Sequence, residues 1–487
     1  MNDWRKQLSD VKKFMQGKLP EKQHMPGQAA ATDSETGPEE AKPLPQRDLC
    51  VGLDFGTSST KSVVRLLPSG PAYVVKFTKD GDEVESYLMP TRLWVATDGT
   101  LALQEKGDGE WVQELKVTLM EKPWVRCPVS PNSKIEARPV DLAAGYIALV
   151  LRSLHQWCVE QVLPALGEVK PRWSLNLGIP ARDLGANEIS EAFGVAAKAG
   201  WHMAVSGGQI EIARMGQAAD QARTPTFIPS GMEADMIQVV PEVAAGVTTY
   251  ARSPAKRAGP HLFVDVGATT LDSSMFLLDD HDGLKYVFLA ADVDSSLGAL
   301  RLHKHRAQEL GSLALERFSA ANPLKPIPPT AKDCLPEDGE LVQIDSHFMD
   351  KCAKKLGSVI YNAKLKDPKG ISIDDSDPSG RIRVMLSGGG VGLPLYQEAV
   401  RLSGERAAPG GGQGLRVRPF SIEPIPKPPD FLPHELPQGA WERLAVAFGL
   451  SYRYEDIGDF VPPSAVPPME APPILPADDL YVSKDQV

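Results

Sequence analysis

The sequence predicts an α/β protein built from two similar lobes. Short apolar segments bounded by Gly, Ser and Pro, which are typical of strands, alternate with longer segments whose apolar residues recur at helical spacing. An order of three strands followed by helices occurs twice, which indicates two similar units rather than one continuous sheet. The length of 487 residues suits this organisation, because a domain averages about 150 residues and two lobes leave room for additional segments.

The first lobe is expected over residues 47–245. Its strands are predicted from apolar segments of about six residues, and its helices from longer periodic stretches. The first three strands follow one another without an intervening helix and therefore form a meander. In order, we expect strands at 49–55, 61–67 and 72–77, a helix over 140–163, a strand over 172–180 and a helix over 187–199.

The second lobe is expected over residues 246–460 and repeats the same order. Three apolar segments again precede the helical ones, and a further strand follows them. We expect strands at 261–267, 271–279 and 285–292, helical regions at 297–318 and 345–366, and a strand at 382–388.

The two ends of the chain differ from the lobes. Residues 1–20 are predicted to contain an amphipathic helix, with a polar side that includes Arg5, Lys6, Lys12 and Lys13 and an apolar side formed by Trp4, Leu8, Val11 and Met15. Residues 21–46 have the composition of a flexible linker, and the Pro-rich residues 461–487 that of a disordered or polyproline tail. We expect an unidentified protein partner to bind the helix or the tail. An unstructured leader and a membrane-touching helix are the alternatives for the first residues.

Composition and charge exclude several functions. The net charge of −11 and the pI near 5.4 give no general attraction to nucleic acid. Five scattered cysteines without a CxxC pair suggest neither a zinc site nor a disulfide framework. No apolar run approaches the roughly 18 residues of a transmembrane helix, and the first residues do not have the pattern of a secretory signal, so a cytoplasmic location is expected.

The first of three glycine-containing turns runs from Asp54 to Lys61. Gly56 lets backbone N–H groups approach an anion closely, so the turn could cradle a phosphate group. Asp54 could hold Mg²⁺ directly or through water, and Lys61 could neutralise phosphate charge. The turn does not follow the Walker pattern, and an ordinary hairpin is the alternative. Additional hydroxyl donors come from Thr57, Ser58 and Ser59.

The second turn runs from Asp265 to Asp272 and the third covers residues 386–394. The second again follows an apolar strand and carries Gly267 and two hydroxyl residues, Thr269 and Thr270. With its two carboxylates it could face the first turn across a cleft and clamp the β- and γ-phosphates with a metal ion between them. The third turn precedes an expected helix, whose N-terminus could accept a nucleotide's sugar, ring or α-phosphate. Its glycines are Gly388, Gly389 and Gly390.

The three turns resemble the nucleotide motifs of the actin-like ATPase superfamily. LDFGTSST, FVDVGATTLDSS and MLSGGGVGLP are similar, in this order, to its phosphate 1, phosphate 2 and adenosine motifs, most closely to those of the heat-shock protein 70 (DnaK-type) nucleotide-binding domain. VVPEVAAGVTTYA and ERLAVAFGLSYR resemble the two connecting helices of that family. The resemblance covers about residues 49–452 and implies an actin-like ATPase fold, in which two RNase H-like lobes surround a cleft for ATP or ADP with Mg²⁺.

The resemblance also implies roles for individual residues. It assigns Asp54 and Asp265 to the metal and its water shell, and Lys116 to the position of the chaperones' active-site lysine. Lys61 instead follows the spacing of actin, ParM and PilM, so either lysine could serve. Lys354, Lys355 and Ser358 resemble the helix that packs against adenine, for which a solvated basic helix face is the alternative. The remaining nucleotide contacts are assigned to Gly56, Thr57, Ser58, Ser59, Gly267, Ala268, Thr269, Thr270, Asp272, Gly388, Gly389 and Gly390.

Two departures from the family bear on catalysis. Val240 stands where the chaperones have a catalytic glutamate, so hydrolysis is expected to be slow or absent unless Glu242 or Gln238 substitutes. Ala268 and Thr269 replace two glycines of phosphate 2, which narrows the room for a phosphate. We therefore expect nucleotide binding more firmly than ATPase activity.

The expected function is an ATP-dependent conformational switch that a protein partner reads. The Pro-rich stretch after residue 449 cannot supply the strands of a peptide-binding domain, so no autonomous client binding is expected. A filament or scaffold protein similar to ParM, MreB, FtsA or PilM is one alternative. A small-molecule kinase is another, because DFGTSSTK also resembles the opening of sugar kinases.

Overall fold

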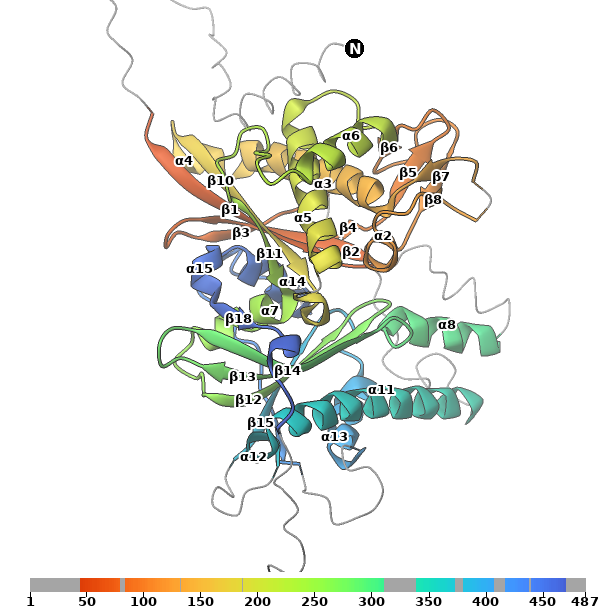
Figure 1. The fold of residues 1–487 in the computed structure, drawn as a ribbon, viewed down its shortest axis with the longest axis vertical. Coiled ribbons are helices and arrows are strands. Elements are labelled where there is room, and N and C mark those ends of the chain that lie inside the picture. The colour runs from red at the N-terminus through yellow and green to blue at the C-terminus, as the bar shows by residue number, and fades with distance from the viewer. Residues whose placement is uncertain are drawn as a thin grey trace, which may run out of the picture.

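Two mixed β-sheets, each covered by helices, form the framework of the protein in a computed structural model (Figure 1). It describes residues 44–78, 84–131, 133–185, 187–310, 339–372, 380–406, 417–437 and 439–469. The helix expected within residues 1–20, most of the linker at 21–46 and most of the tail at 461–487 lie outside these residues. Within the described part of the chain, no helix combines the length and the apolar character needed to cross a membrane.

The first sheet, in the upper half of Figure 1, is built around the expected meander. Antiparallel pairing joins β1 to β2 and β2 to β3, whereas β10 and β11 add parallel strands on the other side of β1. In spatial order its strands are β11 (Ile237–Pro241), β10 (Lys170–Ile179), β1 (Gln46–Phe55), β2 (Ser59–Leu66), β3 (Ala72–Val74) and β17 (Phe431–Leu432), with β4 (Met89–Pro90) paired to β2.

The second sheet has the same topology. Its meander is antiparallel, and parallel strands extend it on both sides. The repeated order of segments in the sequence thus corresponds to two mixed sheets with matching strand directions. In spatial order the strands are β16 (Phe420–Ile422), β15 (Ile382–Ser387), β12 (Gly259–Val266), β13 (Leu271–Asp279), β14 (Lys285–Asp294) and β18 (Asp459–Val461).

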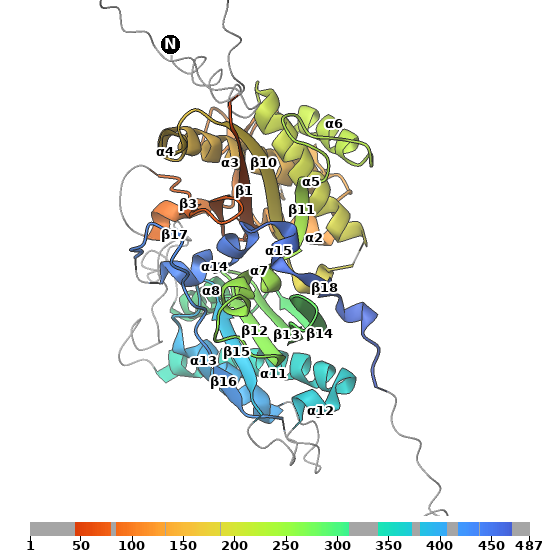
Figure 2. The same cartoon turned by 90° about the vertical axis from the view of Figure 1, so that its left-hand side faces the viewer.

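Helices cover the outer face of each sheet, and two helices lie between the sheets (Figure 2). The first lobe contains α2 (Leu115–Glu121), α3 (Pro139–Gln161), α4 (Leu163–Leu166), α5 (Asn187–Ser206) and α6 (Ile212–Ala222). The second contains α8 (Ala299–Leu310), α11 (Gly339–Lys366), α12 (Pro368–Ile371) and α13 (Pro394–Arg406). Between the sheets lie α7 (Glu242–Ala251) and α14 (Ala440–Leu450), and α15 (Tyr454–Ile457) follows them.

The smaller elements complete the chain. Their strands contain only two to four residues, too few to show a periodic pattern in the sequence, and none of them was predicted. They are β5 (Leu93–Ala96), β6 (Leu101–Ala102), β7 (Gly109–Val112), β8 (Cys127–Pro128) and β9 (Glu136–Ala137), with the 3₁₀ turns η1 (Val84–Tyr87), η2 (Ala181–Asp183) and η3 (Pro463–Ala465).

Several predicted boundaries need correction. The strand expected at 72–77 ends at Val74, because the N–H of Phe77 donates to the carbonyl of Ser86 rather than to the neighbouring strand. Helix α11 begins at Gly339 instead of residue 345, in a stretch without apolar periodicity. The helix expected over 297–318 is described as α8 only as far as Leu310.

The alternation of side chains along each strand decides which residues face the central helices. In β1, Leu49, Val51, Leu53 and Phe55 pack into the outer core of the first lobe. The residues between them, including Gly52 and Asp54, therefore face α14. In β12, Leu262, Val264 and Val266 pack outward, whereas Phe263 packs against α7 and α14. Asp265 shares the parity of Phe263, so Asp54 and Asp265 both point toward the space between the sheets.

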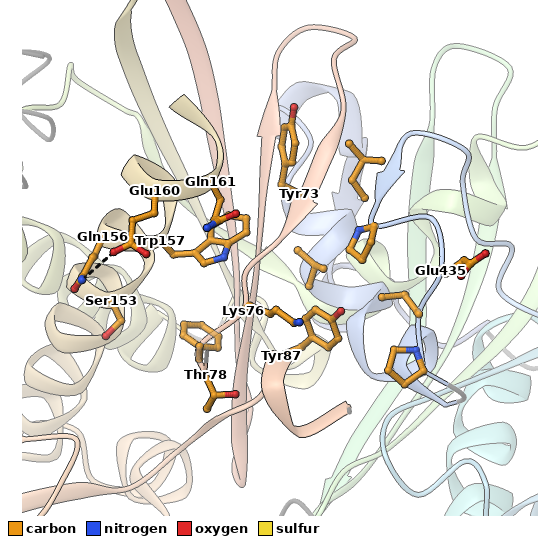
Figure 3. Close-up of a pocket in the computed structure, with 16 residues that line it drawn as sticks. Tyr73, Lys76, Thr78, Tyr87, Ser153, Gln156, Trp157, Glu160, Gln161 and Glu435 are labelled. Atoms are coloured by element: carbon orange, nitrogen blue, oxygen red, sulfur yellow. Dashed lines mark hydrogen bonds between the residues drawn. The ribbon is translucent and has the colours of Figure 1, made fainter. Parts of the chain in front are cut away.

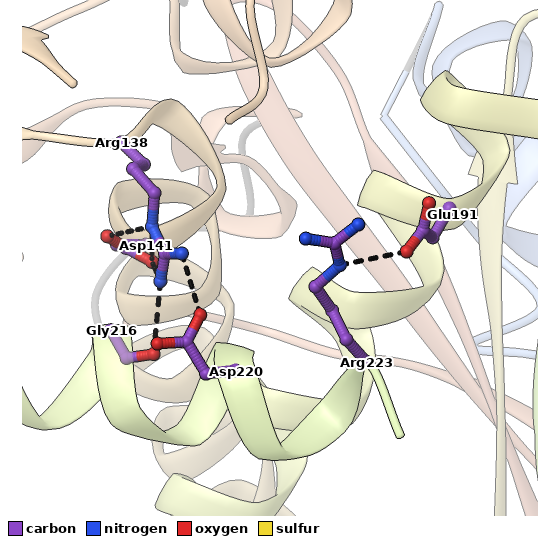
Figure 4. Close-up of polar contacts among 6 residues, drawn as sticks. All are labelled: Arg138, Asp141, Glu191, Gly216, Asp220 and Arg223. Atoms are coloured by element: carbon purple, nitrogen blue, oxygen red, sulfur yellow. Dashed lines mark hydrogen bonds and ion pairs between the residues drawn. The ribbon is translucent and has the colours of Figure 1, made fainter. Parts of the chain in front are cut away.

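An arginine at the start of α3 fastens α6 to the first lobe (Figure 4). Arg138 Nη2 lies 2.8 Å from Asp141 Oδ1, and Arg138 Nη1 lies 2.7 Å from Asp220 Oδ1 on α6. Arg138 Nη2 also donates to the carbonyl of Gly216 at 3.1 Å. Because Asp141 is buried, its carboxylate depends on this arginine for a counter-charge.

Replacing this arginine is expected to destabilise the lobe. Arg138→Met leaves the buried carboxylate of Asp141 unpaired and should lower the free energy of unfolding by about 3 kcal/mol. Denaturant titration followed by circular dichroism measures the loss. The control is Lys256→Met, which breaks an ion pair with the exposed Asp280 and should cost less than about 1 kcal/mol. Equal losses in the two variants would contradict this role of Arg138.

Candidate functional site

The turn between β1 and β2 forms one wall of a polar cavity. Asp54 and Lys61 stand opposite each other in the antiparallel register, and Lys61 Nζ donates to Asp54 Oδ2 at 2.9 Å. The turn folds tightly at Gly56, where a Cβ atom would lie 2.5 Å from the carbonyl oxygen of Ser59. The turn therefore brings a carboxylate and an ammonium group to the same edge of the sheet.

The turn between β12 and β13 forms the opposite wall. The N–H of Gly267 donates to the carbonyl of Thr270 at 2.9 Å and closes the turn. Thr270 Oγ1 donates to Asp272 Oδ2 at 2.9 Å, and Asp272 lies opposite Asp265 in the register. The second turn therefore presents two carboxyl groups side by side.

The glycine-rich turn between β15 and α13 closes the cavity from the second lobe. Gly388 has a φ of 92°, and a Cβ atom there would lie 2.2 Å from Asp265 Oδ1. A side chain at this position would therefore displace the carboxylate. The N–H of Gly388 donates to the carbonyl of Glu442, the residue before Arg443 in α14, and this bond ties the turn to the central helix.

The three turns meet around one cavity of about 90 Å³. The space is comparable to about three water molecules, at roughly 30 Å³ for each. Most of the residues predicted from the sequence line it. They are Asp54, Gly56, Thr57, Ser58, Ser59, Lys61, Lys116, Glu242, Asp265, Gly267, Ala268, Thr270, Asp272, Gly388, Gly389 and Gly390.

A buried ion pair completes the cavity from the first lobe. Lys116 Nζ on α2 lies 2.6 Å from Glu242 Oε1, at the first residue of α7. Gly178 on β10 leaves room for this glutamate, because a Cβ atom there would lie 2.8 Å from Glu242 Cγ. Val240 is buried in the core between the sheets, so the carboxylate of this segment that reaches the cavity belongs to Glu242.

Negative charge dominates the cavity. Among the described residues that line it, four have carboxyl groups, Asp54, Glu242, Asp265 and Asp272, and three are cationic, Lys61, Lys116 and Arg443. An excess of carboxylates in a confined space favours either protonation of one of them or a bound cation.

The pKa values follow from this crowding. Burial, first, and then the charges of Asp272 and Asp54 together raise the pKa of Asp265 from 3.8 to about 7. Burial also raises the pKa values of Asp272 and Glu242. Burial alone would lower the pKa of Lys116, but the nearby carboxylates, first that of Glu242, raise it above its ordinary value, so this lysine stays protonated.

The carboxyl groups suit a cation that brings further ligands with it. Asp265 Oδ1 and Asp272 Oδ1 are buried without a hydrogen-bond partner. In the described part of the chain, no cluster of three or more His, Cys, Asp or Glu residues could enclose a metal ion by itself. Mg²⁺ is commonly held by one or two carboxylates together with phosphate oxygens and water, which fits Asp54 and Asp265.

Some predicted residues lie elsewhere. Thr269 is buried beneath Gly298 and is not part of the cavity lining. Lys355 Nζ pairs with Asp292 Oδ2 on β14 at 2.6 Å, and Lys354 Nζ pairs with Asp350 Oδ2 on α11 at 2.8 Å, so both amino groups are engaged in ion pairs. Ser358 also lies on α11, outside the cavity lining. Gln238, the alternative to Glu242, donates to the carbonyl of Asp235 and does not line the cavity.

Three lining residues were not predicted. Arg443 lies on α14, and a Cβ atom at Gly389 would lie 3.1 Å from Arg443 Nε. Its place in the segment ERLAVAFG, which was expected to form a connecting helix, could have indicated it. Ala299 and Leu300 at the start of α8 complete the lining, and no sequence signal distinguishes them from ordinary core residues.

No protein-family model matches this sequence, and no curated protein shows significant similarity to it.

The raised pKa of Asp265 predicts how stability depends on pH without metal or nucleotide. In the unfolded chain this carboxyl group ionises near 3.8, but in the folded protein it ionises near 7. The folded state is therefore penalised as pH rises between these values. Asp265→Asn should raise the free energy of unfolding at about pH 8 by on the order of 2 kcal/mol.

Urea denaturation in the presence of a chelator, from about pH 4.5 to about pH 8, tests this expectation. The gain should shrink toward the acidic end, where the carboxyl group is protonated in both states. Asp280→Asn is the control, because the hydrogen bond from Lys256 lowers the pKa of Asp280, so this substitution should give no gain. A wild-type protein as stable as Asp265→Asn at about pH 8 would disprove the penalty.

Proposed function

We propose that the protein binds ATP with Mg²⁺ between its two sheets and acts as a nucleotide-dependent conformational switch for a protein partner. The observation that carries this proposal is that two hairpin turns far apart in the sequence, one with Asp54 and one with Asp265, line the same cavity. The matching strand order of the two sheets supports the finer proposal of an actin-like ATPase fold with two RNase H-like lobes.

The cavity has the chemistry that a polyphosphate requires. Backbone N–H groups of the turns and the hydroxyls of Thr57 and Ser58 can donate to phosphate oxygens. Lys61, Lys116 and Arg443 can balance phosphate charge. Bound Mg²⁺ would be held by Asp54 and Asp265 and would offset the carboxylates that crowd the site. In this proposal both lysines serve the site, Lys61 beside a metal ligand and Lys116 beside Glu242.

The size of the cavity links binding to a change of shape. Ligand pockets usually enclose about 300 Å³ or more, whereas this cavity encloses about 90 Å³. In this proposal the two lobes move apart to admit a nucleoside triphosphate. Because the turns come from different lobes, a ligand that contacts both stabilises one relative position of the lobes. A partner bound outside the cavity can read that position.

Hydrolysis is proposed to be slow. Glu242 is the carboxylate available to orient an attacking water in place of Val240, but it is paired with Lys116 at 2.6 Å. Burial raises the pKa of Glu242, but the charge of Lys116 opposes this rise and makes the carboxylate a weaker general base than an unpaired one. The site is therefore better suited to binding ATP than to rapid turnover.

Nucleotide binding is tested by thermal unfolding of the full-length protein with and without millimolar ATP and Mg²⁺. A ligand at about 100 times its dissociation constant stabilises the folded state by about 2.7 kcal/mol, which should raise Tm by a few degrees. Asp265→Asn should abolish the part of the shift that depends on Mg²⁺, whereas Asp280→Asn, just after the far end of β13, should retain it. No shift in the wild-type protein would refute the proposal.

Turnover is tested separately with radiolabelled ATP. If Glu242 orients the attacking water, Glu242→Gln should reduce hydrolysis by about 100-fold or more while ATP still raises Tm. If the wild-type protein binds ATP and releases no phosphate, the switch operates without hydrolysis. Equal turnover by wild type and Glu242→Gln would exclude this residue as the base.

A further inference from the structure

A large groove on the first lobe takes no part in the polar cavity. It has a volume of about 1110 Å³ and lies between the C-terminal half of α3 and residues 432–437, with β3 and the residues after it between these two walls (Figure 3). Four aromatic residues line it, together with leucines and prolines from residues 432–437. The aromatic residues are Tyr73, Phe77, Tyr87 and Trp157.

The groove combines apolar side chains with polar and charged ones, among them Lys76, Glu160 and Glu435. Tyr73, Phe77 and Trp157 are only partly buried, so part of their apolar surface is accessible. Glu160 on α3 and Glu435 on the opposite wall carry negative charge at the two sides (Figure 3). Accessible aromatic side chains next to polar and charged residues are a common composition of interaction sites.

We propose that this groove is the docking site of the chain's own residues 1–17, which bind in it as an amphipathic helix. The apolar positions of this segment recur at spacings of four, three and four residues, as helix-in-groove recognition requires. A helix of this length is marginal in water and gains stability by burying its apolar face. The residues that would face the groove are Trp4, Leu8, Val11 and Met15.

The dimensions of segment and groove agree. The stretch from Trp4 to Met15 would be about 17 Å long as a helix, and half of a helical cylinder of that length and about 10–12 Å diameter occupies roughly 670–960 Å³. A groove of about 1110 Å³ accommodates this half cylinder. The charges are also of opposite sign, although the excess on each side is small. Residues 1–17 contain four basic and two acidic side chains, and the charged residues that line the groove are Glu160, Glu435 and Lys76.

The tether reaches the groove. The carbonyl of Pro45 accepts from the N–H of Lys170, so the chain enters the first sheet beside the start of β10. Ala72 of β3 pairs with Arg65, which pairs with Cys50 of β1. Strand β3, which lines the groove, is therefore two strand spacings, about 10 Å, from β1. Its pairing places it level with Cys50, which is four residues, about 13 Å, from the start of β1. Residues 18–43 form a tether whose r.m.s. reach is about 28 Å if it is flexible.

The Pro-rich tail is a less suitable occupant. The N–H of Met469 donates to the carbonyl of Leu365 at 3.0 Å, so the tail leaves the described structure beside the C-terminal end of α11 in the second lobe. The N-terminal segment instead enters in the same sheet as the groove, which favours it as the occupant.

Docking within one chain requires only modest intrinsic affinity. A short flexible tether holds a segment at an effective concentration of about 1 mM. With an intrinsic dissociation constant of about 100 μM, the groove would be occupied about ten times as often as it is free. Amide exchange in residues 1–17 should therefore be about tenfold slower than in a variant that cannot dock.

Hydrogen–deuterium exchange of the full-length protein without nucleotide tests the proposal independently of ATP binding. Trp4→Ala/Leu8→Ala should speed exchange in residues 1–17 about tenfold and should also deprotect residues 73–78 and 153–161. The matched control is Asn2→Ala/Ser9→Ala, on the opposite side of the same helix, which should leave both regions protected. Glu160→Lys/Glu435→Lys, at the exposed rim, should weaken docking without affecting the fold.

Four results would overturn the proposal. Exchange in residues 1–17 of the wild-type protein as fast as in a free peptide of the same sequence would show that the segment is not docked. Deprotection of the groove by the control pair as strong as that by Trp4→Ala/Leu8→Ala would show that the apolar face is not what binds. Protection that grows with protein concentration would assign the groove to a segment from a second copy. Deprotection of the groove on removal of residues 470–487, but not in Trp4→Ala/Leu8→Ala, would assign it to the tail.

Discussion

The close crossing of α7 and α14 between the two sheets is the constraint on which the rest of the structure depends. At Gly449 a Cβ atom would lie 1.8 Å from the carbonyl oxygen of Ala245, so the two helix backbones touch. Gly52 similarly allows α14 to approach β1, because a Cβ atom there would lie 2.2 Å from the carbonyl oxygen of Ala447. These contacts hold the inner faces of the two sheets close to each other. The strand ends that carry Asp54 and Asp265 therefore border one cavity.

This arrangement costs electrostatic free energy in the absence of a ligand. Carboxyl groups from both lobes are brought together in a small space, and burial raises the pKa of Asp265 to about 7. The ion pairs Lys61 with Asp54 and Lys116 with Glu242 offset part of the cost. Asp265 and Asp272 each retain a buried oxygen without a partner. These unpaired oxygens support the proposal that a cation binds here, and a cation that carries phosphate oxygens would also engage the lysines.

One short segment connects the proposed nucleotide site to the groove on the first lobe. Residues 431–432 form β17 at the edge of the first sheet, and residues 432–437 line the groove. The chain then continues into α14, which carries Arg443 to the cavity. Movement of α14 during opening of the cavity would therefore shift one wall of the groove, which gives the two sites a direct mechanical connection.

The sequence by itself determined the local features of this protein. Apolar segments of about six residues predicted both meanders, and the glycine turns at 56, 267 and 388 were recognisable because Gly has no Cβ atom and allows tight turns. It also indicated that Asp54 and Asp265 end buried strands. It could not fix the limits of β3 or α11, because those depend on hydrogen bonds to Ser86 and on packing rather than on periodicity. Short strands of two to four residues left no pattern at all.

Only the tertiary structure decided which residues share the cavity. Asp54 and Asp265 are separated by more than 200 positions, and their meeting depends on the crossing of α7 and α14. The same crossing brings Arg443 into the site. There it lies beside the three turns, which come from other parts of the sequence. Lys354 and Lys355, which matched a motif by spacing, instead pair with acidic neighbours in the second lobe. Spacing along the chain describes local geometry, whereas burial and charge at a site arise from contacts between distant segments.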